Sequence, residues 1–185
     1  NVTIDPDQNI IEGSVRTFGT FAGRYKGQKI YFVAKFDQEF SAFGIWDGTK
    51  FKENSKIATS DNLIINLSFN DPKINVKVGI SYVSIENARL NLDIEIGDLT
   101  FDEIVEKAKQ SWEDKLALIK INGGSEEEQR IFYSALYRSF QMPTLYTDVN
   151  GNYIGFDNQI HRASGFNYYT DLSLWDTFRT IHPLF

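Results

Sequence analysis

The spacing of apolar residues changes once along this chain of 185 residues, close to residue 98. Before that point apolar side chains recur with a period of two, as in residues 30–36, 63–69 and 74–82. A period of two is typical of β-strands, because successive side chains point to opposite faces. Turn-forming Gly, Asn and Asp residues separate the runs. Several short strands at this spacing predict a two-sheet sandwich over residues 1–98.

After residue 98 the period becomes helical. Thr100 with Glu103 forms the pattern of a capping box, and apolar residues then recur at helical spacing to about residue 121. Ser125 with Glu128 marks a second helix, which Pro143 ends, and a third helix is expected to begin near Asp171 as its cap. The order of elements is therefore β followed by α, which predicts segregated layers rather than alternating βαβ units.

Two segments allow more than one prediction. Residues 84–96 alternate as a strand would, but Ser84 could instead cap a short helix that buries Ile85, Ala88 and Leu92. We favour the helix. Residues 145–156 predict a hairpin around Asn150-Gly151, the pair preferred in type I′ turns.

Composition excludes several classes of protein. The net charge is −6 and the chain contains no basic block, which argues against a nucleic acid partner. Cysteine is absent, so disulfides and thiolate metal sites are excluded. No apolar run reaches the roughly 20 residues of a membrane-spanning helix. The aromatic share of 15% suits both β-sheets and sugar-binding surfaces.

The segment around Trp175 and Asp176 is the strongest candidate site. A flat indole beside a carboxylate can bind a sugar, since the ring packs on the C–H face and the acid accepts hydroxyl hydrogen bonds. The alternative is structural: Trp175 lies in a core and Asp176 pairs with Arg179 at i, i+3.

Other polar patterns are weaker. Residues 148–152 read Asp-Val-Asn-Gly-Asn, as in the start of a calcium loop, but Tyr153 and Gln159 stand at the sixth and twelfth positions of that template. The hairpin is the better interpretation. His161 and His182 have no metal-ligand spacing. Residues 43–48 could be a sandwich loop that carries an aromatic residue to a ligand, although a strand end followed by a turn explains them equally well.

Six segments in order give the chain a resemblance to a known family. They read YFVAKFD (31–37), VGISYVS (78–84), ARLNL (88–92), IFYSALYR (131–138), YIGFD (153–157) and SLWDTFR (173–179). Together they resemble the exo-acting α-mannosidases of glycoside hydrolase family 92, typified by bacterial α-1,2-mannosidases.

The resemblance implies a fold of mainly β plus α structure in three parts. These are an N-terminal β-sandwich over residues 1–98, a helical connector over 99–122, and the beginning of an (α/α)6 catalytic barrel, truncated, over 123–185. It also implies removal of terminal α-linked mannose, α-1,2-linked, from mannan or N-glycan by inverting hydrolysis with Ca²⁺. The implied location is periplasmic or extracellular, with the signal peptide outside this chain.

The resemblance also guides the choice of site residues. Trp175 and Asp176 are expected to contact the terminal mannose, with Phe43, Gly44 and Ile45 as further contacts from the sandwich. The catalytic residues are expected downstream of Phe185, and the calcium ligands outside this fragment, so no catalytic or metal-binding residue is assigned within it. The expected partners are a mannose-containing glycan and the remainder of the catalytic domain, and the fragment alone is expected to be inactive.

Two alternatives stay open. One is an inverting sugar phosphorylase of similar architecture, and the other is a non-catalytic, carbohydrate-binding β-sandwich.

Overall fold

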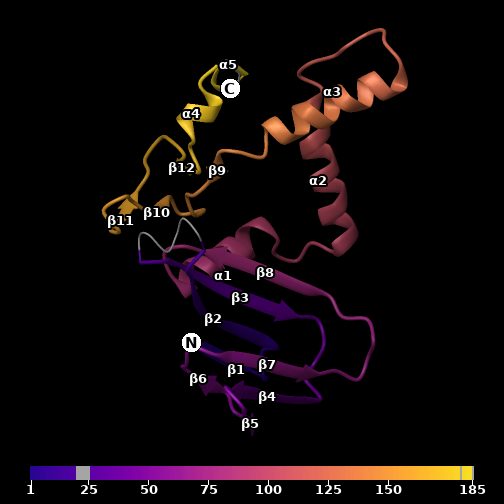
Figure 1. Ribbon diagram of the computed structural model, residues 1–185. Coiled ribbons are helices and arrows are strands. Elements are labelled where there is room, and N and C mark those ends of the chain that lie inside the picture. The colour runs from indigo at the N-terminus through magenta and orange to yellow at the C-terminus, as the bar shows by residue number, and fades with distance from the viewer. Residues whose placement is uncertain (20–25, 180, 185) are drawn as a thin grey trace. The chain divides into compact units, whose positions relative to one another are not determined.

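The computed structural model describes residues 1–19, 26–179 and 181–184 (Figure 1). The chain divides into two compact units. The first unit comprises residues 1–98 and 148–162, and the second comprises residues 99–147 and 163–185. The chain therefore passes between the units three times, at 98–99, 147–148 and 162–163. The domain boundaries expected from the sequence stay a prediction.

Two antiparallel sheets form the body of the first unit. The larger sheet has the strand order β6-β1-β2-β3-β8, and the smaller has the order β5-β4-β7. The strands of the larger sheet are β1 (Val2–Asp5), β2 (Ile10–Thr17), β3 (Gln28–Phe36), β6 (Ile57–Ala58) and β8 (Val76–Ser81). Those of the smaller are β4 (Ala42–Asp47), β5 (Lys50–Glu53) and β7 (Leu63–Ser68). The predicted strands at 30–36, 63–69 and 74–82 are thus confirmed, with small shifts of their ends.

The main core lies where the two sheets face each other. Ile4 and Ile11 from the larger sheet are buried against Ile45 from the smaller one. Half-buried rings and aliphatic side chains surround these residues, including Phe32, Phe36, Phe43, Ile65 and Leu67. Alternation along each strand explains this core, because every second side chain faces the opposite sheet.

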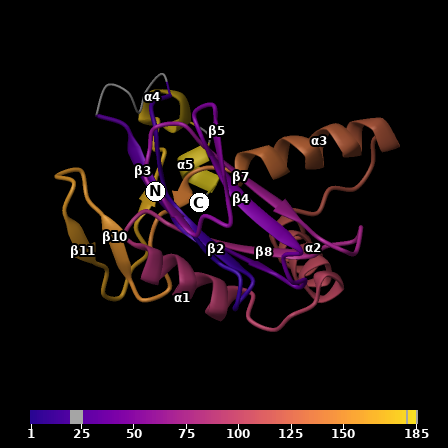
Figure 2. The same ribbon diagram turned by 90° about the horizontal axis from the view of Figure 1, so that it is seen from below.

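A helix covers the other face of the larger sheet. Helix α1 (Ile85–Glu95) begins after Ser84, whose side chain accepts a hydrogen bond from the Asn87 backbone N–H. Ala88 and Leu92 are buried against Val33 and Ile10. Gly79 of β8 makes this contact possible, because a Cβ at that position would lie 2.3 Å from the Ala88 carbonyl oxygen. The helix predicted for residues 84–96 is confirmed, and the first unit has the layer order α1, larger sheet, smaller sheet (Figure 2).

The first unit also contains a hairpin from later in the chain. Strands β10 (Asn152–Ile154) and β11 (Ile160–Arg162) pair with each other, with Asn152 opposite Arg162. The hairpin predicted around Asn150-Gly151 is therefore wrong in its pairing. That turn is present, with the Asp148 N–H donating to the Asn152 carbonyl, but β9 (Thr144–Leu145) pairs with β12 (Tyr169–Thr170) instead.

Helices dominate the second unit. Both predicted capping boxes are present, at Thr100 for α2 (Phe101–Leu116) and at Ser125 for α3 (Glu126–Ser139). The two helices contact each other through Trp112 and Tyr137, whose ring centroids lie 4.4 Å apart. The first helix ends at Leu116, earlier than the predicted residue 121. That these helices begin an (α/α)6 barrel stays a prediction.

Two short helices close the described chain, α4 (Leu174–Thr177) and α5 (Ile181–Leu184). Ser173 stands at the N-cap of α4, and Asp171, the predicted cap, lies two residues earlier with φ of 62°. An N-cap residue normally has extended dihedral angles, so the left-handed backbone at Asp171 is unsuited to a cap and the helix begins after Ser173. No helix among the described residues is long and apolar enough to cross a membrane.

The C-terminal residue, Phe185, lies outside the described residues. The catalytic residues were expected downstream of Phe185, so their position stays a prediction.

Candidate functional site

Trp175 and Asp176 lie on the short helix α4. The Trp175 side chain is 88% exposed, so its ring is not part of a core within this chain. The Ser173 hydroxyl donates a hydrogen bond to the Asp176 carboxylate. Ser173 also accepts, through its backbone carbonyl, a hydrogen bond of 2.9 Å from the Thr177 hydroxyl. The helix therefore carries an exposed indole and an exposed carboxylate at adjacent positions, and the cap residue holds the carboxylate.

Arg179 does not form the ion pair that the structural interpretation expected. Its guanidinium lies 5.3 Å from the centroid of the Phe178 ring, and no ion pair joins it to Asp176 in the described part of the chain. A carboxylate accepts up to about four hydrogen bonds, so Asp176 keeps acceptor capacity for a ligand hydroxyl.

The sandwich residues expected to contact sugar lie in β4. Ile45 is fully buried, and Phe43 packs against the same core between the sheets. Gly44 faces outward beneath the Phe51 ring, since a Cβ there would lie 2.4 Å from a ring carbon. The side chains of Phe43 and Ile45 are turned away from solvent in this structure, and their contact with sugar stays a prediction. The exposed aromatic residue of the segment is its neighbour Trp46.

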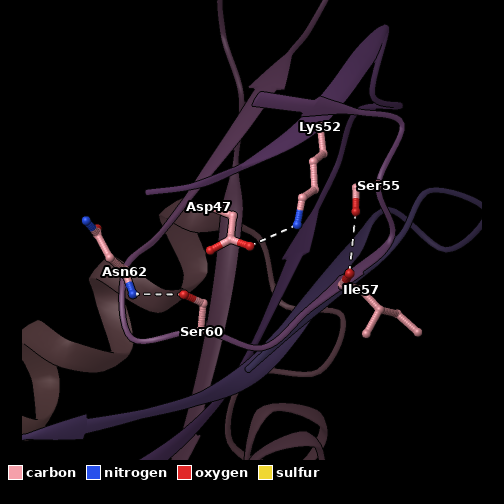
Figure 3. A network of polar contacts seen from close by, with 6 residues as sticks. All are labelled: Asp47, Lys52, Ser55, Ile57, Ser60 and Asn62. Carbon is pink, nitrogen blue, oxygen red and sulfur yellow. Dashed lines mark hydrogen bonds and ion pairs between the residues drawn. The ribbon is translucent and has the colours of Figure 1, made fainter. Parts of the chain in front are cut away.

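The β4–β5 hairpin carries a network of polar contacts (Figure 3). The Lys52 ammonium lies 2.8 Å from the Asp47 carboxylate, and the Ser60 hydroxyl accepts a hydrogen bond from the Asn62 N–H. Hydrogen bonds from Lys52 and Ser60 hold the pKa of the Asp47 carboxyl below its usual value. The ion pair of this network joins β4 to β5 near their turn.

A second polar group, exposed on the β10–β11 hairpin, joins Asp157 and His161. The His161 Nε2 lies 3.0 Å from each oxygen of the Asp157 carboxylate. The Gln159 backbone N–H, and then His161, hold the pKa of the Asp157 carboxyl below its usual value. The Tyr153 ring lies 5.6 Å from the imidazole, centroid to centroid. His161 therefore has a structural partner within its own hairpin.

A buried carboxylate anchors this hairpin to α1. Asp148 is 9% exposed, and its Oδ2 accepts hydrogen bonds of 2.7 Å from the Ser81 hydroxyl and from the Asn87 amide. Its Oδ1 accepts a bond of 2.8 Å from the Asn91 amide. The side-chain Oδ1 of Asn91 in turn accepts a hydrogen bond from the Val149 backbone N–H. We call Ser81, Asn87, Asn91 and Asp148 the Asp148 cluster.

The Asp148 cluster does not fit a calcium ion. Calcium needs six to eight oxygen ligands, whereas both oxygens of this carboxylate are occupied by N–H and O–H donors at 2.7–2.8 Å. No group of three or more His, Asp or Glu side chains suited to a metal occurs among the described residues. The loop that resembled a calcium site is a structural anchor instead.

Three members of the cluster were missed in the sequence. Asn87 and Asn91 stand four residues apart on α1, directly beside the buried pair Ala88 and Leu92. An amide pair at i, i+4 next to the apolar stripe of a helix is a usable signal for a buried polar contact. Their distant acceptor, Asp148, could not be found this way.

Two family profiles match the chain. The profile of the glycosyl hydrolase family 92 N-terminal domain matches residues 1–81, and that of the family's catalytic domain matches residues 87–185. The chain belongs to glycosyl hydrolase family 92. The resemblance inferred from the six sequence segments is thereby confirmed.

Solved structures of family 92 enzymes have the same fold. An inverting mannosidase from Bacteroides thetaiotaomicron VPI-5482 is 28% identical and superposes over 100% of this chain with a TM-score of 0.90. An α-mannosidase from Bacteroides thetaiotaomicron is 29% identical over 96% of the chain, with a TM-score of 0.83. The mixed β and α fold predicted from the sequence is thereby confirmed. The chain spans 25% of each of these relatives.

A curated relative matches a shorter part of the chain. A protein of Arthroderma benhamiae described as an uncharacterized secreted glycosidase is 34% identical over 88 residues, which are 45% of this chain and 11% of that protein. The family 92 catalytic-domain profile begins at residue 87, within α1, and includes the β10–β11 hairpin, which belongs to the first unit. The division between the two profiles therefore differs from the division between compact units.

Proposed function

We propose that this chain is part of an enzyme that removes terminal α-linked mannose, α-1,2-linked, from mannan or N-glycan with inversion. The observation that carries the proposal is the exposed pair Trp175 and Asp176 on α4, in a chain whose solved relatives include mannosidases. The indole packs on the C–H face of the mannose ring, and Asp176 accepts hydrogen bonds from its hydroxyls.

In this proposal Trp175 and Asp176 hold the sugar and do not cleave it. Inverting hydrolysis uses two carboxyl groups about 6.5–9.5 Å apart, one to protonate the leaving oxygen and one to activate water. The chain spans a quarter of its solved relatives, and we assign that pair to polypeptide downstream of Phe185. Calcium belongs to the proposal as an ion that binds sugar hydroxyls, with ligands outside the described residues.

The proposed location is the periplasm or the extracellular space. The support is the relative from Arthroderma benhamiae, which is described as secreted.

The test measures mannose release from α-1,2-mannobiose by the whole polypeptide that contains this chain. Asp176→Asn is expected to lower kcat/KM about ten- to a hundredfold, the range for losing hydrogen bonds to a charged group. Trp175→Ala is expected to lower it by about the same factor, through loss of the apolar contact between the indole and the sugar ring. Phe156→Ala, at an exposed hairpin tip, is the matched control and should leave kcat/KM unchanged. Full activity of both site variants would refute the assigned role.

Two further measurements test the phosphorylase alternative and the inactivity of the chain by itself. Turnover that requires inorganic phosphate would favour a sugar phosphorylase. The purified chain of 185 residues is expected to release no mannose by itself, and release would contradict the assignment of the catalytic pair to the remaining polypeptide.

A further inference from the structure

The outward face of the smaller sheet carries an apolar row across all three strands. Trp46 of β4 is paired with Phe51 of β5 on one side and with Ile64 of β7 on the other. Their side chains are 38%, 45% and 60% exposed, respectively. The Trp46 and Phe51 rings lie 5.1 Å apart, centroid to centroid. We call this row, with the polar residues described next, the Trp46 surface.

The next row on the same face is polar. Gly44 is paired with Glu53 on one side and with Asn66 on the other, and both side chains are exposed. The rows are two residues apart along each strand, about 7 Å. Because Gly44 has no side chain, the Phe51 ring lies over its backbone, in the row that also contains Glu53 and Asn66. Aromatic faces thus stand next to groups that accept and donate hydrogen bonds.

The surface belongs to the outside of the first unit. The inner face of the same strands is filled by the core, and α1 lies beyond the larger sheet, two layers away (Figures 1 and 2). The Asp47–Lys52 ion pair joins the two strands of the hairpin (Figure 3). The aromatic pair is therefore displayed on paired strands, and displaying it exposes no part of the core.

The size of the row argues against a protein partner. A buried aromatic side chain covers about 150–250 Å², so the exposed parts of these three residues offer roughly 300 Å². A stable protein interface needs about 800 Å² from each partner. The edge strand β5 also carries Lys50, Lys52 and Glu53, charges that discourage pairing with another sheet edge. A second copy of this chain is therefore a poor occupant.

We propose that the Trp46 surface binds a neutral glycan chain, as a site separate from Trp175 and Asp176. A pyranose has an apolar C–H face that packs on Trp46 and Phe51, and hydroxyls at its rim that reach Glu53 and Asn66. Such a site holds a polymeric substrate without taking part in cleavage. The choice of α-mannan as the glycan rests on the proposed function.

Affinity electrophoresis of the full 185-residue chain in gels containing soluble yeast α-mannan tests the proposal. Mannan is expected to retard the unaltered chain, and Trp46→Ala and Phe51→Ala are expected to raise its dissociation constant at least about tenfold. Asn66→Ala tests the polar row without touching an aromatic residue and should weaken binding severalfold. Circular dichroism confirms that each variant is folded.

Phe156→Ala is the matched control, because it removes an exposed aromatic ring that belongs to neither candidate site. Retention of mannan binding in this variant, with loss in Trp46→Ala, supports the proposal. The opposite pattern overturns it but leaves the proposed function intact. Absence of retardation of the unaltered chain, or sedimentation showing a dimer that depends on Trp46, also overturns it.

Discussion

The Asp148 cluster leads to a prediction about stability. In Asp148→Ala the carboxylate is lost, and the side-chain donors of Ser81, Asn87 and Asn91 lose their acceptor in a site where each is less than a tenth exposed. A hydrogen bond to a charged group contributes about 1.5–3 kcal/mol, and a buried donor left without a partner costs about 1–3 kcal/mol.

The expected loss is smaller than the sum of three such bonds. The donors share one carboxylate, and water can enter the space that the missing side chain leaves, so their contributions are not additive. We expect the free energy of unfolding to fall by about 3–5 kcal/mol, a large part of the roughly 5–15 kcal/mol typical of a domain. Asp148→Asn keeps the shape but replaces one acceptor oxygen by a donor, so its loss should be smaller.

Urea unfolding of the full chain, followed by circular dichroism at constant pH, measures these losses. Asp157→Ala is the matched control, because it removes an exposed carboxylate from the same hairpin and should leave the midpoint nearly unchanged. Chymotrypsin provides a second readout at the exposed Phe156, since release of the hairpin should speed cleavage there. A loss below about 1 kcal/mol for Asp148→Ala, with unchanged cleavage, would refute the anchoring role.

Three further predictions follow from local geometry. Gly79→Ala should destabilise the chain by about 1–3 kcal/mol in urea unfolding, because the new Cβ meets the α1 backbone, whereas Gly19→Ala meets nothing within 4 Å and should have little effect. Ser125→Ala should cost about 1 kcal/mol in the same assay through loss of the α3 cap, and equal stability of variant and unaltered chain would contradict the assigned cap. Lys52→Ala should raise the pKa of the Asp47 carboxyl toward its ordinary value of 3.8 in a ¹³C NMR titration, and an unchanged pKa would refute the pairing. Because the pKa of this carboxyl is lowered in the folded chain, its contribution to stability is present above pH 3.8 and is lost as the pH falls through the folded pKa.

Local signals in the sequence were sufficient for much of the fold. Alternation at residues 30–36 and the capping boxes at Thr100 and Ser125 depend on neighbours within a few residues, and each produced the expected element. The Asn150-Gly151 turn shows where local reasoning fails. Its turn chemistry was recognised, but the pairing of the flanking residues is determined by contacts with α1 and with residues 160–170.

The candidate site was less predictable than the fold. The sequence identified Trp175 and Asp176 as side chains suited to binding sugar. It did not predict that they are exposed, because the neighbouring apolar residues are equally compatible with a buried helix. For Phe43 and Ile45 no local pattern indicates which way the side chains face, since β4 has apolar residues on both sides. The outward side of that strand became visible only through its pairing with β5 and β7.

The Asp148 cluster also has a consequence for the order of folding. Its hydrogen bonds join residues 57 to 67 positions apart, so a loop of that length must close before any of them forms. During synthesis from the N-terminus, both sheets and α1 are complete well before Asp148 is added to the chain. Until then Asn87 and Asn91 must remain hydrated, and the first unit reaches its final form only when residue 162 has been made. Folding of this unit is therefore expected to end with the docking of its hairpin, a late step in which long-range contacts replace bound water.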